Sequence, residues 1–203
     1  MSNKEIITND NSFVFKLLDG NEAFTHNGHP VDFSVKDYWS FQFSNIWDMV
    51  EEVAEFLVAK ALGLSMPQNK NGWTLYDMPY REKRIEVKTT TYYHPWSPDG
   101  KYSERRSFGI TKAYSTYKDR SSSYERQNDI YVFCITEGKN QVSADPRNLD
   151  NWRFYVVPTS TINRECGDNE HISLGRVSKF ARPQGGVGFE ELKAAIDGII
   201  DQE

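Results

Sequence analysis

The feature that most constrains this fold is an almost uninterrupted apolar run at residues 129–135, Asp-Ile-Tyr-Val-Phe-Cys-Ile. A strand that alternates apolar and polar residues buries one face, whereas a continuous apolar strand buries both. The run therefore predicts a central strand that other elements cover on its two faces. A chain of 203 residues is long enough to supply that cover within one domain.

Two segments have the apolar period of amphipathic helices. Residues 44–63 begin with Ser44 as a candidate N-cap and end at Gly63, and residues 189–200 carry apolar side chains on one face. Runs of β-branched or aromatic residues predict further strands at 73–77, 84–92, 107–111 and 152–157. The predicted fold class is α/β (α+β), with a mixed central sheet flanked by helices.

Residues 1–43 show no sustained period, so they predict an irregular N-terminal segment with a short strand at 13–15. Residues 44–203 are expected to form a single domain. Two cysteines, Cys134 and Cys166, are too few for a disulfide framework. The polar first residues do not resemble a secretory signal, and no apolar stretch approaches the length of a membrane span. We therefore expect a cytoplasmic protein with no membrane partner.

Basic residues gather in the middle of the chain, although the whole sequence carries a net charge of −5. Residues 81–126 contain 11 Lys and Arg against 6 Asp and Glu, and both flanking segments are acidic. A local excess of positive charge suits a polyanion, and interleaved aromatic residues suit unpaired bases. A solvated charged surface is the alternative. The candidate nucleic-acid contacts are Lys83, Arg84, Lys101, Arg105, Arg106, Lys112 and Arg126.

Three residues in and before the strand predicted at 84–92 suggest a reaction centre. Glu86 and Lys88 are two positions apart, so a strand directs both side chains to one face and Val87 into the core. Asp77 belongs to the neighbouring predicted strand, from which its carboxylate can meet that of Glu86. Two converging carboxylates suit Mg²⁺, and a nearby ammonium can act on a water or on a phosphate. The alternative is an exposed ion pair without a chemical role.

These residues, preceded by a glutamate-bearing helix and followed by an apolar strand, resemble the motif of the PD-(D/E)xK superfamily, the restriction-endonuclease-like nucleases. The likeness covers roughly residues 44–157, and Tyr76 stands where the motif's name places proline. The resemblance implies Mg²⁺-dependent cleavage of phosphodiester bonds in DNA, with Mn²⁺ as a substitute. It also implies that Asp77, Glu86 and Val87 are the metal ligands and that Lys88 helps the attacking water.

A glutamate of helix 44–63 is also expected to be catalytic, and Glu51, Glu52 and Glu55 are the candidates. Glu51 and Glu55 share one face of the helix, while Glu52 lies about 100° away. Glu55 is favoured because it follows the small residue Ala54, which lets the helix approach a sheet closely.

Two other functions remain open. One is a non-catalytic module that keeps this fold and binds nucleic acid or protein. The other is a metal-dependent phosphoesterase for a small substrate. The like charges of an intact acidic site disfavour the first, and the basic, aromatic middle disfavours the second. The sequence leaves the oligomeric state open, and a homodimer is one arrangement that it allows.

Overall fold

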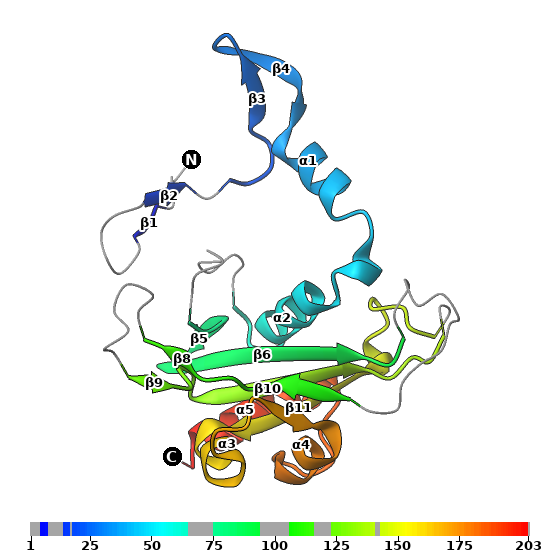
Figure 1. The fold of residues 1–203 in the computed structure, drawn as a ribbon. Helices are drawn as coiled ribbons and strands as arrows, with labels where there is room; N and C mark the ends of the chain where they lie inside the picture. The colour runs from blue at the N-terminus through cyan, green and yellow to red at the C-terminus, as the bar shows by residue number, and fades with distance from the viewer. Residues whose placement is uncertain are drawn as a thin grey trace. The chain divides into compact units, whose positions relative to one another are not determined.

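The computed structural model describes residues 5–7, 14–16, 18–64, 75–93, 106–115, 123–140 and 143–202, and Figure 1 shows it as a ribbon. The chain divides into two compact units, Met1–Ile46 and Trp47–Glu203. It has both α-helices and β-sheets, and its largest sheet is mixed.

The first unit contains two antiparallel strand pairs and a helix, so its described residues are more regular than predicted, and the strand predicted at 13–15 lies at Val14–Lys16. Asn27 and Gly28 join β3 to β4, and both have positive φ angles, 50° and 77°. An Asn-Gly pair favours this kind of turn, and it is the sequence signal that the prediction overlooked. Ser34 and Asp37 form a capping box that starts the helix. The elements are β1 (Glu5–Ile7), β2 (Val14–Lys16), β3 (Ala23–His26), β4 (His29–Ser34) and α1 (Val35–Gln42).

The second unit is built on a four-stranded sheet with the order β11-β10-β6-β5 (Figure 1). β10 runs parallel to β6 and antiparallel to β11, and β5 forms an antiparallel hairpin with β6. Every residue of β10 is buried, which confirms the central strand. The strands are β5 (Met78–Tyr80), β6 (Lys83–Thr91), β10 (Ile130–Thr136) and β11 (Trp152–Pro158), and the short pairs are β7 (Ser107–Gly109) with β12 (His171–Ser173) and β8 (Ala113–Tyr114) with β9 (Tyr124–Glu125).

Two hydrophobic clusters cover the two faces of this sheet. The first joins alternate residues of β6, β10 and β11 to the helices α2 (Val50–Ala61) and α5 (Phe189–Ile200). The second joins the intervening residues of β10 and β11 to α3 (Thr159–Cys166), α4 (Leu174–Phe180), β7 and β12. Figure 1 shows α2 on one side of β6, and α3 and α4 on the opposite side of the sheet.

Several predicted elements agree with the structure and others require correction. The strands at 84–92 and 152–157 and the helix at 189–200 are confirmed within one residue. The helix predicted at 44–63 begins only at Val50, after a 3₁₀ turn at Ile46–Asp48, and the Ser44 hydroxyl donates to the Phe41 carbonyl. Gly63 does stop this helix, because its φ of 68° allows the two closing hydrogen bonds Gly63 N–H to Lys60 O and Leu64 N–H to Ala59 O.

The strand predicted at 73–77 is the main error near the candidate site. Residues 73 and 74 lie outside the described residues, and residues 75–77 form a bend. The strand β5 lies instead at Met78–Tyr80, and it includes Pro79. Arg81 and Glu82 make the following tight turn with φ angles of 46° and 65°. Turns of this kind usually contain glycine or asparagine, and the lack of both at these two positions explains why the strand before the turn is misplaced in the prediction.

Candidate functional site

Glu86 and Lys88 lie side by side on one face of β6, as their spacing predicts. The intervening residue Val87 and the preceding Ile85 are buried in the first cluster. The Lys88 ammonium forms an ion pair with the Glu86 carboxylate. The side chain of Glu86 is 17 % exposed and that of Lys88 is 37 % exposed, so solvent reaches both side chains in part. An ion pair between these two residues is what the alternative predicts, although the Glu86 side chain is more buried than an exposed pair would be.

Asp77 is attached to the same strand by two hydrogen bonds. Its backbone N–H donates to the Ile85 carbonyl at 3.0 Å, and its carboxylate accepts the Val87 N–H at 2.6 Å. The pairing of β5 with β6 ends at Met78 and Ile85, so Asp77 lies just beyond the short strand. The predicted neighbourhood of Asp77 and β6 is therefore present, although Asp77 belongs to a bend and not to a strand.

The electrostatic environment of Glu86 favours its protonated form. Burial raises the pKa of Glu86, the Lys88 ammonium opposes this shift, and the carboxylate of Glu55 adds to it. Burial alone would lower the pKa of Lys88, but the carboxylates of Glu86, Asp77 and Glu51 reverse the effect, so the pKa of Lys88 is raised. The carboxylates of Glu51, Glu55, Asp77 and Glu86 thus influence this pair, although Glu86 and Lys88 face the second cluster and α2 covers the opposite face of the sheet.

The helix α2 contributes two of these carboxylates. Glu55 is partly buried and close enough to act on Glu86 and on the Cys134 thiol, whereas Glu51 is exposed and acts on Lys88. Glu52 is also exposed. Among the three predicted candidates, the structure places Glu55 deepest. Cys134 is fully buried, and burial raises the pKa of its thiol well above the usual range, so it is a core residue.

The donor set suits a hard cation in part. Asp77 and Glu86 supply carboxylate oxygens, which Mg²⁺ and Mn²⁺ prefer. The Val87 side chain is in the core, so only the Val87 backbone carbonyl could bind a metal. In a strand, the carbonyl and the N–H of one residue point to the same edge, and the Val87 N–H donates to the Asp77 carboxylate. Within the part of the chain that the structure describes, no three His, Cys, Asp or Glu side chains gather closely enough to hold a metal. A cation here would need the backbone oxygen and water as further ligands.

The basic residues predicted to contact nucleic acid are dispersed, and the five that the structure describes all have partners within the fold. Arg84 forms a bidentate pair with Asp129, at 3.0 and 2.8 Å, and Lys112 pairs with Asp168. The Arg84 guanidinium holds the pKa of Asp129 below its usual range. Lys83 is partly buried and also has a partner. Lys101 and Arg105 lie outside the described residues.

Arg126 requires a correction. It is 5 % exposed and donates to the carbonyls of Ile110, Gly167 and Asn169 and to the side chain of Asn163. A buried guanidinium that satisfies four acceptors holds loops together and is not available to a phosphate. Arg126 is therefore removed from the predicted contacts.

Arg106 has a different environment. It lines a cavity of about 580 Å³ together with Tyr155, Ser107, Ser173 and Ser178. One terminal N–H₂ donates to the Tyr92 carbonyl at 2.7 Å, and the guanidinium lies 5.3 Å from the centre of the Tyr92 ring. Its Nε is buried without a hydrogen-bond partner. Burial lowers the pKa of Arg106, and no described carboxylate pairs with it, so this cation is the predicted contact best prepared for an anion.

Comparisons with family models, with curated proteins and with solved structures find no match to this chain. Within the described residues, no helix is both long enough and apolar enough to cross a membrane. The function must therefore be argued from the arrangement of the residues themselves.

Proposed function

We propose that this protein is a divalent-cation-dependent nuclease that hydrolyses phosphodiester bonds in DNA. The observation that carries the proposal is the arrangement of Asp77, Glu86 and Lys88 around the middle of β6. Asp77 is held by the Val87 N–H, and Glu86 is partly buried beside Lys88. A helix glutamate, Glu55, raises the pKa of Glu86 further. This combination supports the PD-(D/E)xK resemblance and a restriction-endonuclease-like fold.

Each residue has a role in this proposal. Mg²⁺ or Mn²⁺, held by Asp77, Glu86 and the Val87 carbonyl, would lower the pKa of a bound water and stabilise charge on the phosphate. Lys88 would donate a hydrogen bond to the attacking water or to a phosphate oxygen, because it is the charged donor next to the carboxylates. Glu55 would orient water at the same site. Arg106 would bind a phosphate remote from the reaction.

We also propose that the protein is cytoplasmic. A homodimer would present two such sites to the two strands of a duplex. The rival function is a non-catalytic module that binds nucleic acid or protein. The pairs Arg84–Asp129 and Lys112–Asp168 reduce the charge available to a nucleic acid, which within this rival favours a protein ligand.

The direct test is an assay of the purified protein on plasmid, single-stranded and branched DNA with Mg²⁺, Mn²⁺ or EDTA. Cleavage that EDTA abolishes and that Asp77→Asn reduces at least a hundredfold is expected, because the variant loses a charged metal ligand. Asp145→Asn is the matched control, since Asp145 pairs with Arg147 outside the site. If the protein binds these DNA substrates but cleaves none of them, the non-catalytic module is favoured.

A further inference from the structure

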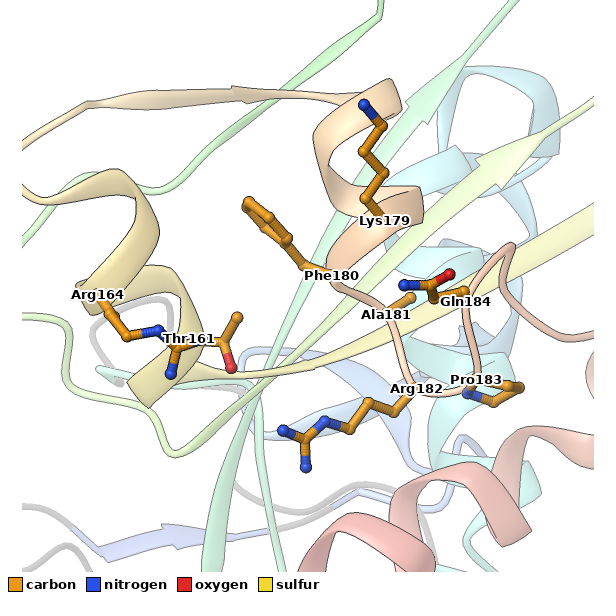
Figure 2. Close-up of a pocket in the computed structure, with 8 residues that line it drawn as sticks. All are labelled: Thr161, Arg164, Lys179, Phe180, Ala181, Arg182, Pro183 and Gln184. Atoms are coloured by element: carbon orange, nitrogen blue, oxygen red, sulfur yellow. The ribbon is translucent and has the colours of Figure 1, made fainter.

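A second cavity, of about 360 Å³, lies between α3 and the loop that follows α4. Its lining includes three cationic residues, Arg164, Lys179 and Arg182, and none of its eight lining residues is acidic. Figure 2 shows the guanidinium groups of Arg164 and Arg182 reaching into the space between α3 and this loop. The Lys179 ammonium points away from them, and the Phe180 ring forms an apolar wall.

The two arginines keep most of their donors for a ligand. Arg164 forms an ion pair with the Glu165 carboxylate through its Nε–H, at 2.9 Å, and Arg182 has a long contact of 3.5 Å with the Gln202 side chain. Each guanidinium has five N–H groups, so donors remain on both. Arg176 stands beside this cavity, 5.3 Å from the centre of the Phe180 ring, and adds a further positive charge. Two guanidinium groups that face one space suit a phosphate, which accepts several charge-assisted hydrogen bonds.

The position of this cavity relates it to Arg106. The helix α4 provides Leu174, Gly175 and Ser178 to the cavity of Arg106, and it provides Lys179 and Phe180 to the cavity of Arg164 and Arg182. One helix of seven residues, about 10 Å long, therefore borders both. The second cavity could not be predicted from the sequence, because its cations come from separate segments of a net acidic region.

We propose that Arg164 and Arg182 bind a phosphate group of a nucleic-acid strand. The inference shares the nucleic-acid ligand with the proposed function, but it does not depend on cleavage. A free nucleotide carries the same phosphate chemistry, so the experiment compares a single-stranded oligonucleotide with a nucleoside monophosphate.

The experiment measures binding in EDTA on the Asp77→Asn background, where cleavage cannot interfere. Arg164→Ala/Arg182→Ala should weaken oligonucleotide binding about tenfold or more, since charge-assisted hydrogen bonds to phosphate are lost. The slope of log K against log salt should fall by about 0.7 for each single-strand phosphate contact removed. Lys139→Ala/Arg147→Ala is the matched control, because it removes the same charge elsewhere on the surface. The melting temperature of each variant verifies its fold, and Arg164→Gln/Arg182→Gln is a second test if the alanine variant is unstable.

The outcomes separate the two proposals. A loss confined to the oligonucleotide supports a strand phosphate, and a loss of mononucleotide binding alone assigns the same phosphate site to a free nucleotide. The inference is overturned if Arg164→Ala/Arg182→Ala binds both ligands as tightly as the control variant does. It is also overturned if the Asp77→Asn protein binds neither ligand. Cleavage is measured separately, on the wild type with Mg²⁺ or Mn²⁺. Lost oligonucleotide binding in the double variant together with no wild-type cleavage keeps the inference and rejects the nuclease, whereas wild-type cleavage with unchanged oligonucleotide binding does the reverse.

Discussion

At the residue scale, Lys88 distinguishes catalysis from binding. Its side chain shares the partly exposed face of Glu86 and is outside the core, so Lys88→Ala should leave β6 folded. Cleavage should fall by a factor of about 10² or more, because the donor that acts as charge develops is lost. Affinity for DNA should fall far less, since one contact among several is removed. Cleavage, affinity and melting temperature on one substrate test this, and cleavage within threefold of wild type would remove Lys88 from the mechanism.

Glu86 gives a prediction about stability and pH. Its pKa is raised in the folded protein, so the fold binds this proton more tightly than the unfolded chain does. The resulting stabilisation is complete below the unfolded pKa and is lost as the pH rises through the folded pKa. Glu86→Gln should therefore raise the melting temperature at neutral pH and flatten its decline above pH ~4.5, the ordinary glutamate range. Each kcal/mol corresponds to about 2–4 °C for a chain of this size.

Divalent cations supply the complementary measurement for Glu86. Mg²⁺ or Mn²⁺ should raise the melting temperature of the wild type, because a ligand that binds the folded state stabilises it by mass action. Glu86→Gln should lose most of this increase, whereas Glu52→Gln, on the exposed part of α2, should retain it. If Glu86→Gln melts at a lower temperature than the wild type without metal, and if Mg²⁺ or Mn²⁺ raises its melting temperature as much as that of the wild type, the assignment of Glu86 as a metal ligand is wrong.

Residue-scale prediction from the sequence worked where a strand fixed the geometry. The period of two placed Glu86 and Lys88 on one face and Val87 in the core, and the structure agrees. It failed for Arg126, because a charge count does not reveal that carbonyls from three distant loop positions converge on one guanidinium. Burial of a basic side chain depends on tertiary contacts that no local pattern encodes.

At the element scale, the loop after α4 is fixed by contact with β11. Gly186 has a φ of 72°, and a Cβ there would lie 2.7 Å from the Phe154 carbonyl and 2.8 Å from the Tyr155 ring. The neighbouring Val187 exchanges hydrogen bonds of 2.8 and 2.9 Å with Phe154. Gly186→Ala should therefore destabilise the protein by about 1–3 kcal/mol through overpacking, in addition to the strain of its φ.

Gly185 provides the control for that experiment. Its φ is 85°, but a Cβ there meets nothing within 4 Å, so Gly185→Ala reports the backbone strain alone. Urea unfolding of both variants should show the larger loss for Gly186→Ala. Equal losses would mean that the close approach to β11 contributes nothing. Because Arg182 is carried by this loop, Gly186→Ala should also weaken oligonucleotide binding.

Helices and strands with long apolar patterns could be predicted from the sequence, and short ones could not. The strands β10 and β11 and the helix α5 have long apolar signals, and their positions are confirmed. The helices α3 and α4 have no clear signal in the sequence because they are short, eight and seven residues, and α3 is largely polar. Their apolar residues become meaningful only when packed on the second cluster. The hairpin of β5 was misplaced because its strand contains Pro79 and its turn lacks glycine.

At the scale of the whole molecule, the described residues that form the two hydrophobic clusters all lie between Val50 and Ile200. Both clusters belong to the unit Trp47–Glu203, which also contains Asp77, Glu86, Lys88 and both cation-lined cavities. A core that needs no residue of the first unit predicts that the second unit folds by itself. We expect a fragment of residues 47–203 to unfold cooperatively, with a melting temperature within a few degrees of the full chain.

The same fragment should keep the functional properties proposed for the site. Stabilisation by Mg²⁺ or Mn²⁺ and its loss in Glu86→Gln should be the same in the fragment and in the full chain, because every group involved is present. Thermal unfolding and oligonucleotide binding, measured in parallel on the two proteins, test this. A fragment that lacks cooperative unfolding would show that Met1–Ile46 completes the fold. A folded fragment that has lost metal stabilisation or binding would instead give the first unit a part in the site itself.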